Sequence, residues 1–181
     1  METAKESKKK EKRMGREILS WAGTLAAALV IALVIRSFVF TFIAVKGKSM
    51  QETLQNGDRL YVSILTARIE GYERGDVVIC RYPGRRDYCV KRVIGVPGDV
   101  VSAQNGLIFL NGEPLREDYV SPIHAAHYDY PETTLAEGEY FLLGDNRAVS
   151  HDSHSIDVGP VTDIVGKARA IIWPPAHISA L

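Results

Sequence analysis

The chain has 181 residues, of which 46% are hydrophobic, and its 22 Lys and Arg balance 22 Asp and Glu. This length accommodates one compact domain and a membrane anchor. The charge is uneven, because residues 1–17 hold seven Lys or Arg against four Glu, whereas residues 46–181 hold 14 against 18. A mildly acidic main part argues against a nucleic-acid-binding protein, so we expect no nucleic acid among the partners.

An uncharged apolar segment, residues 18–35, follows the basic start. Its 18 residues are long enough for a transmembrane helix. Arg36 then interrupts it, and residues 37–45 extend the apolar character up to the main domain. Because basic residues before a span stay in the cytoplasm, we predict a single-pass protein of the cell membrane. Its parts are a cytoplasmic tail (1–17), an anchor with a juxtamembrane segment (18–45) and an extracytoplasmic domain (46–181).

Two other interpretations of residues 18–35 are a buried core helix and a cleaved signal peptide. A signal peptide has an apolar core of about 7–15 residues that ends at a small-x-small cleavage site. The core here is longer, and Ala26-Ala27-Ala28 lies in its middle. We therefore favour an uncleaved anchor.

The remainder of the chain has the pattern of a β protein. Stretches rich in Val, Ile and Tyr alternate with turn signals such as Asn56-Gly57-Asp58 and Pro97-Gly98-Asp99. Short strands at this spacing favour a mostly β domain with an antiparallel sheet or barrel-like arrangement. The predicted strands are residues 59–65, 76–82, 88–96, 100–103, 107–110, 139–143 and 164–173. Residues 118–135 lack clear periodicity and are expected to form a long loop.

The two cysteines, Cys80 and Cys89, flank a predicted hairpin tip at residues 81–88. We expect them to face each other on paired strands. A disulfide persists in an extracytoplasmic domain, and both a disulfide and two thiols remain open. No C-x-x-C motif or histidine cluster predicts a zinc site.

Ser49 is a candidate nucleophile just beyond the apolar segment. It follows Gly47, which permits unusual backbone angles and close approach of a peptide. Backbone N–H groups near Gly47 to Ser49 are candidate donors to an oxyanion, and Met50 is expected at the membrane interface or in the core. A serine after a glycine is, however, most often an ordinary turn residue.

Lys91 is a candidate general base inside a predicted strand. Strand alternation places Cys89, Val93 and Gly95 on its face, so its neighbours there are small or apolar. Burial disfavours an ammonium and lowers its pKa, which a lysine needs to accept a proton near neutral pH. The simpler alternative is an exposed strand lysine.

A dense polar segment, residues 144–154, lies between two apolar strands. Turn chemistry explains its Gly, Asp and Asn, but not the grouping of Arg147, Ser150 and Asp152 with two histidines. Such a set is suited to orienting a lysine through hydrogen bonds. The neighbours His151 and Asp152 point apart on an extended chain, which argues against a Ser-His-Asp triad.

These segments together resemble the type I signal peptidases, in the short single-span form of Gram-positive bacteria. Each match is modest, but five in the family's order after one apolar segment are specific. The matching segments are Gly47-Lys48-Ser49-Met50, Gly57-Asp58, Arg74-Gly75-Asp76-Val77-Val78, Lys91 to Asp99 and Gly144-Asp145-Asn146-Arg147 through Asp152.

The resemblance implies a serine endopeptidase with a mostly β fold on the outer membrane face. It implies that Ser49 is the nucleophile and Lys91 the base, that Ser150 hydrogen-bonds the lysine, and that Asp152 and Arg147 hold the loop. Gly47, Met50 and Asp145 are further supporting positions. The implied substrates are exported preproteins, cut after small residues at −1 and −3; the lipid bilayer and the export translocon are candidate partners, and no cofactor is required.

Two positions depart from the family's pattern. Glu52 stands where the family usually has proline, and its carboxylate is expected to point to solvent. His154 stands where the family usually has arginine. Because an imidazole carries charge only at lower pH, we hypothesise that its pairing with Asp152 weakens above about pH 7.

Three other interpretations of the sequence remain. A LexA-like self-cleaving peptidase shares the Ser and Lys chemistry, but the apolar segment and the lack of a DNA-binding module argue against it. A sortase-like transpeptidase needs a reactive cysteine with His and Arg, and neither cysteine has that setting. A catalytically impaired, membrane-anchored binding or assembly protein is the alternative that Glu52 and His154 keep open.

Overall fold

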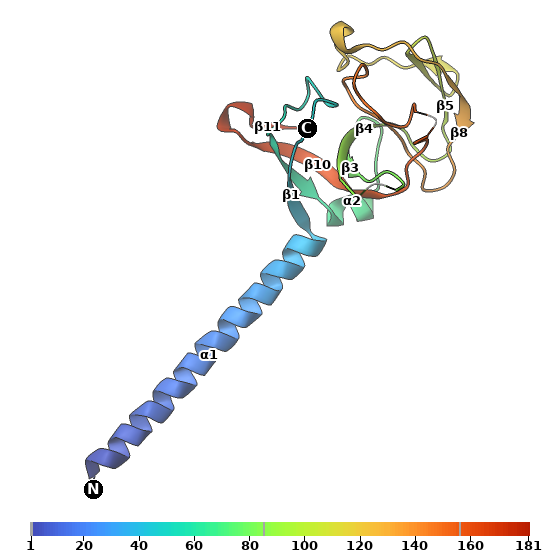
Figure 1. The fold of residues 1–181 in the computed structure, drawn as a ribbon. Helices are drawn as coiled ribbons and strands as arrows, with labels where there is room; N and C mark the ends of the chain where they lie inside the picture. Colours follow the sequence, from blue (N-terminus) through green and yellow to red (C-terminus); the bar gives the residue numbers. More distant parts are fainter. Residues whose placement is uncertain (1, 85, 156) are drawn as a thin grey trace. The chain divides into compact units, whose positions relative to one another are not determined.

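The computed structural model describes residues 2–84, 86–155 and 157–181, and inside the first helix it describes the side chains of residues 14, 17, 20–35 and 38. The chain divides into two compact units, Met1–Val39 and Phe40–Leu181. The first holds one helix and the second holds the strands (Figure 1).

Helix α1 runs over Glu2–Phe38. Its sequence contains no proline and is rich in Ala, Leu, Lys and Glu, which are strong helix formers. Ile18, Leu19 and Arg36 belong to the segment predicted to cross the membrane, and their side chains lie outside the described ones. Among the residues that are described, no helix has the length and apolar character of a membrane span.

The second unit is mostly β, as predicted, and its strands pair antiparallel in two sheets (Figure 1). In the described residues the larger sheet has the order β1-β2-β10-β3-β4-β9, with β11 paired to β10, and the smaller has the order β7-β6-β5-β8. The strands of the larger sheet are β1 (Phe40–Ala44), β2 (Arg59–Ser63), β3 (Val77–Cys80), β4 (Cys89–Gly95), β9 (Phe141–Leu143), β10 (Ile164–Trp173) and β11 (Ser179–Ala180). Those of the smaller are β5 (Val100–Gln104), β6 (Leu107–Leu110), β7 (Glu113–Pro114) and β8 (Tyr130–Thr134). Helix α2 (Leu65–Glu70) and the 3₁₀ turns η1 (Pro122–His124) and η2 (Pro175–His177) complete the unit.

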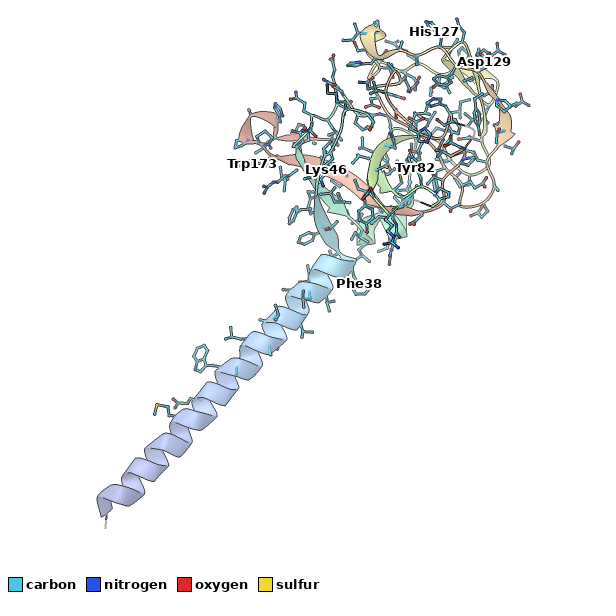
Figure 2. All side chains as sticks on the ribbon, in the orientation of Figure 1. Phe38, Lys46, Tyr82, His127, Asp129 and Trp173 are labelled. Carbon is cyan, nitrogen blue, oxygen red and sulfur yellow. The ribbon has the colours of Figure 1, made fainter. Side chains whose placement is uncertain are left out.

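Among the described residues, the buried core lies in three clusters of apolar side chains. One of them gathers Met50 with Leu54 and Leu60, and each of these is at most 2% exposed. Burying a side chain of this size stabilises the fold by about 1.5–3 kcal/mol. Figure 2 shows Tyr82 within the body of the β unit, whereas Trp173 at the end of β10 projects from it and is 51% exposed. Met50 therefore belongs to the core, one of its two expected places.

Three segments differ from the predicted secondary structure. The loop expected over residues 118–135 contains strand β8, which pairs with β5 at the edge of the smaller sheet. Pro131 obscured this strand in the sequence, because a proline lacks the N–H of a central strand but is tolerated at an edge. Residues 40–44, placed by the sequence in the juxtamembrane segment, form β1 and pair with β2. The strand predicted to run to Leu65 ends at Ser63, and Leu65 begins α2 instead.

Candidate active site

A cleft of about 440 Å³ brings together the end of β1, the segment after it and the start of β4. The predicted nucleophile and base, Ser49 and Lys91, both line this cleft. No hydrogen bond joins the two side chains directly among those of the described residues. The complete lining is Ile43, Ala44, Val45, Lys46, Gly47, Ser49, Met50, Asp87, Tyr88, Cys89, Val90 and Lys91.

Ser49 lies in a short segment that is held at both sides. Gly47 has a φ of 97°, a left-handed conformation that favours glycine, and its N–H donates to Asn56 Oδ1 at 3.0 Å. Gly47 N–H is therefore engaged, which makes it a poor oxyanion donor. On the other side, Met50 is 2% exposed and packs in the core. Ser49 itself is half-buried at the cleft.

Lys91 is buried, with only 2% of its surface exposed. It lies opposite Val78 in the ladder between β4 and β3, so its neighbour there is apolar. Its Nζ donates to Ser150 Oγ at 2.6 Å, which is the hydrogen bond that the resemblance implied. Burial lowers the pKa of Lys91 below its ordinary value, and the nearby charge of Asp152 opposes this effect without cancelling it. Lys91 is thus suited to accept a proton.

Asp152 holds the other side of Ser150. It is fully buried, and its Oδ2 accepts hydrogen bonds from Ser150 Oγ and, at 2.7 Å, from Gly144 N–H. Burial alone would raise the pKa of Asp152, but the hydrogen bond from His154, the charge of Lys91 and the hydrogen bond from Ser150 outweigh it, so the pKa is lowered. The carboxylate is therefore ionised and orients the Ser150 hydroxyl.

The loop that carries Ser150 also contacts the segment that contains Ser49. Asn146 N–H donates to the carbonyl oxygen of Ser49 at 3.0 Å. A Cβ added at Gly144 would lie 2.2 Å from Ser150 Oγ and 2.4 Å from the Ser49 carbonyl oxygen. Only a glycine at position 144 leaves room for both the Ser150 side chain and the Ser49 carbonyl. Gly144 is therefore required at the site for steric reasons.

Asp145 forms a buried ion pair with Arg92 beside the site. Its carboxylate accepts two hydrogen bonds from Arg92, at 2.9 and 2.7 Å, and one from Thr53 Oγ1 at 2.5 Å. Arg92 also stacks over the ring of Tyr119, with 4.2 Å between the guanidinium carbon and the ring centre. Asp145 therefore links β4, next to Lys91, with the segment after Ser49.

Arg147 anchors the loop through Glu117. The two form a bidentate pair at 2.8 and 2.5 Å, with side chains 3% and 11% exposed, and Arg147 Nε also donates to the carbonyl of Gly144. Burial opposes the charge of Arg147, but the hydrogen bonds to Glu117 more than offset this, so its pKa is raised. Glu117 was not among the predicted site residues, because no motif or spacing ties it to a loop 30 positions away.

Glu117→Gln is expected to lower the free energy of unfolding by about 3–5 kcal/mol, because the buried guanidinium of Arg147 then lacks a counter-charge. Urea unfolding followed by circular dichroism measures the change. Asp118→Asn is the matched control, because Asp118 pairs with Arg116 where both side chains are largely exposed, and its unfolding midpoint should hardly move. Equal effects of the two substitutions would contradict the anchoring role of Glu117.

The two departures from the family's pattern have different surroundings. The side chain of Glu52 is 64% exposed, as expected, and its carboxylate lies 3.7 Å from His124 Nε2. His154 lies against Asp152, with 2.5 Å between Nδ1 and Oδ1. His151 is separate from both, because its Nε2 faces Asp157 at 3.1 Å. The structure thus agrees with the argument against a triad of Ser49, His151 and Asp152.

The two cysteines face each other in the ladder of β3 and β4, as predicted from the hairpin. Both are thiols in the structure, Cys80 buried and Cys89 half-buried at the cleft. Burial raises the pKa of Cys80 to about 12. Cys80 therefore stays neutral at physiological pH and serves as an apolar neighbour of Lys91.

Comparison with known proteins shows which sequences and structures this chain is similar to. Residues 18–173 match the family model described as signal peptidase, peptidase S26. Signal peptidase IB of Staphylococcus aureus (strain COL) is 36% identical over 177 residues, which cover 89% of this chain and 92% of that protein. The probable signal peptidase I-2 of Synechocystis sp. is 33% identical over 181 residues, covering 97% and 82%. A solved signal peptidase I from Enterococcus faecalis V583 has a TM-score of 0.45 at 27% identity, covering 53% of this chain and 95% of that one.

Proposed function

This chain belongs to the signal peptidase family, peptidase S26, and on that basis we propose that Ser49 and Lys91 are the catalytic pair of a membrane serine endopeptidase that removes signal peptides from exported preproteins. The observation that supports the pair best is the burial of Lys91 in the cleft that Ser49 also lines. A desolvated amine is a base near neutral pH, and a serine hydroxyl needs such a base to become a nucleophile.

In the proposed reaction, the neutral amine of Lys91 takes the proton of Ser49 Oγ as the oxygen attacks the scissile carbonyl. Ser150 accepts a hydrogen bond from Lys91 and donates one to Asp152, which leaves the amine's lone pair for Ser49. Lys91 then gives the proton to the leaving amine, and an acyl-enzyme forms. A water molecule that loses its proton to Lys91 attacks the ester, and Lys91 returns that proton to Ser49 Oγ as the signal peptide leaves.

The N–H of Ser49 is our candidate for stabilising the oxyanion. Gly47 N–H is bound to Asn56, whereas no hydrogen bond among the described residues uses Ser49 N–H. A backbone donor at the nucleophile itself lies close to the carbonyl under attack. The reaction therefore needs no metal or organic cofactor for this step.

Strand β1 is our candidate for binding the substrate chain. It lies at the edge of the larger sheet, and its last residues line the cleft. An edge strand offers unpaired N–H and C=O groups to an extended peptide. Ile43 and Val90 make part of the lining apolar, which suits small side chains at −1 and −3 of the signal peptide.

We also propose that residues 18–35 anchor the enzyme, with the N-terminus in the cytoplasm and the β unit outside. The large apolar side chains described in α1 are exposed, among them Trp21 at 71% and Leu25 at 68%. Exposed apolar side chains on an uncharged helix segment are suited to lipid. An anchor holds the enzyme at the surface where membrane-inserted preproteins are found, which raises their effective concentration; the translocon is a candidate neighbour.

A synthetic signal-peptide substrate tests the function. With alanine at −1 and −3 we expect cleavage after −1, and replacing the −1 alanine with phenylalanine should lower kcat/KM by at least about 100-fold, because a shallow pocket rejects the ring. Mass spectrometry locates the cut. Binding of the peptide without cleavage would favour the alternative, an impaired binding or assembly protein of the same fold.

A further inference from the structure

His154 is held tightly against the loop of the candidate base. Its Nδ1–H donates to Asp152 Oδ1 at 2.5 Å, and its ring stacks on Tyr128 with 4.2 Å between ring centres and 27° between planes. The side chain is 17% exposed, while Asp152 is fully buried. The imidazole therefore has one fixed position, facing a carboxylate that water does not reach.

Asp152 connects His154 to Lys91. Its Oδ1 faces the imidazole, and its Oδ2 accepts the hydroxyl of Ser150, which in turn accepts a hydrogen bond from Lys91 at 2.6 Å. The charge of Asp152 favours the ammonium form of Lys91. A cation on the other oxygen counters that charge, so the state of His154 affects the state of Lys91.

The partner of Asp152 differs from those of the neighbouring carboxylates. Asp145 faces Arg92, and Glu117 faces Arg147, so both have a counter-charge at every working pH. Among the described residues, the basic groups that interact with Asp152 are those of Lys91 and His154, and neither is an arginine. When Lys91 becomes neutral, the buried carboxylate therefore keeps a counter-charge only if His154 is an imidazolium, and a buried unpaired charge is costly.

We propose that His154 is a positioning residue whose imidazolium balances the charge of Asp152 and so keeps Lys91 in its neutral, base form. The proposal rests on the proposed function, in which Lys91 is the general base. The network His154–Asp152–Ser150–Lys91 then carries one proton on the imidazole of His154 and none on the amine of Lys91 beyond its neutral form. An imidazole is suited to this because its charge changes between about pH 5 and 8.

The other groups around this pair do not supply the charge. Tyr128, stacked on His154, has its pKa raised by burial to about 12 and stays neutral. Arg147 and Glu117, which also lie near Tyr128, neutralise each other. Around Lys91, Asp145 is matched by Arg92, and Cys80 is neutral. Cys89, the remaining neighbour, is half-buried at the cleft.

The first test reads protonation directly, without catalysis. In the full chain carrying Ser49→Ala, NMR of ¹³C-labelled lysine follows the titration of Lys91, and ¹⁵N shifts of the His154 ring report its charge. We expect an imidazolium at the pH where Lys91 is already an amine. A neutral His154 ring at that pH overturns the proposal, and this result needs no substitution at position 154.

Two substitutions then separate charge from packing. His154→Gln keeps a hydrogen-bond donor toward Asp152 but lacks the positive charge. The midpoint of the Lys91 titration should therefore rise by about one pH unit. His154→Arg keeps the charge at every pH, so the midpoint should stay or fall. In the active enzyme the acid limb of kcat/KM should move in the same way, with about a tenfold loss for His154→Gln at a pH below the limb.

His151→Gln is the matched control, because His151 lies in the same loop but faces Asp157. It should leave the acid limb in place. A loss in both position-154 variants that is equal at every pH would assign His154 a packing role only and overturn the proposal. If no form of the enzyme cleaves, the proposed function fails, while the NMR titration still decides the role of His154.

Discussion

Ser49→Ala is expected to abolish cleavage of a signal-peptide substrate, lowering kcat by at least about 10³-fold, because the proposed attacking oxygen is removed. The other hydroxyl beside Lys91, that of Ser150, is buried and donates to Asp152, so it does not replace Ser49. The substitution removes a single oxygen from a half-buried side chain. The carbonyl of Ser49 still accepts the N–H of Asn146, so the loop contact is retained. The fold should therefore survive, which circular dichroism and the unfolding midpoint can verify.

The measurement is single-turnover cleavage, together with mass spectrometry for an acyl-enzyme. The acyl adduct should form at Ser49 in the active protein and be lost in the variant. Ser102→Ala serves as the control, because Ser102 lies in β5 of the smaller sheet and does not line the cleft. Cleavage by Ser49→Ala at a rate near that of the unmodified protein would end the assignment of the nucleophile.

Lys91→Met is expected to abolish cleavage to a similar degree, because Ser49 then has no base. It should also change the pH dependence of stability. Burial lowers the pKa of Lys91 in the folded protein, while the unfolded chain has a value near 10.5. Unfolding therefore takes up a proton between the two values, and stability contributed by this site rises with pH up to the unfolded value.

The change of the free energy of unfolding with pH should differ between Lys91→Met and the unmodified protein. As pH falls from 10.5 toward the lowered pKa of Lys91, the unmodified protein should lose free energy of unfolding relative to Lys91→Met. Loss of the hydrogen bond to Ser150 offsets the gain by about 1 kcal/mol at every pH. Urea unfolding at several pH values measures the difference.

Lys48→Met, an exposed lysine, is the control and should follow the unmodified protein in this pH dependence. If Lys91→Met also followed it, the buried amine would have an ordinary pKa. The proposed base would then be protonated at neutral pH, and the mechanism would need another proton acceptor.

Much of the β unit could be predicted from the sequence. The stretches 107–110 and 164–173 match β6 and β10 at both ends, because period-two alternation and flanking turn residues act locally. Strand β8 could not be predicted in this way, because Pro131 is tolerated only at an edge, and edge position depends on the whole sheet. Strand β1 also lies at an edge, and in the sequence it is part of an apolar segment. Only its pairing with β2 identifies it as a strand.

The candidate site, too, was predictable only in part. Alternation along one strand predicted that Lys91 faces apolar neighbours, and the structure confirms its burial. Glu117 and Tyr128 carry no motif, and they reach Arg147 and His154 only because the segment after β7 packs on the loop. Gly144 has an ordinary turn explanation in the sequence, and its steric role follows from contacts with Ser49 and Ser150.

The sequence by itself determined the mostly β class, the pairing of Cys80 opposite Cys89, and the choice of Ser49 and Lys91 as the pair to consider. These depend on local periodicity and on motif order, which the chain carries along its length. The tertiary structure alone decided that both residues line one cleft, that Asp152 joins Lys91 to His154, and that Glu117 anchors the loop. Such contacts join residues distant in the sequence, and burial, which sets the charge of each group, exists only once the sheets have packed.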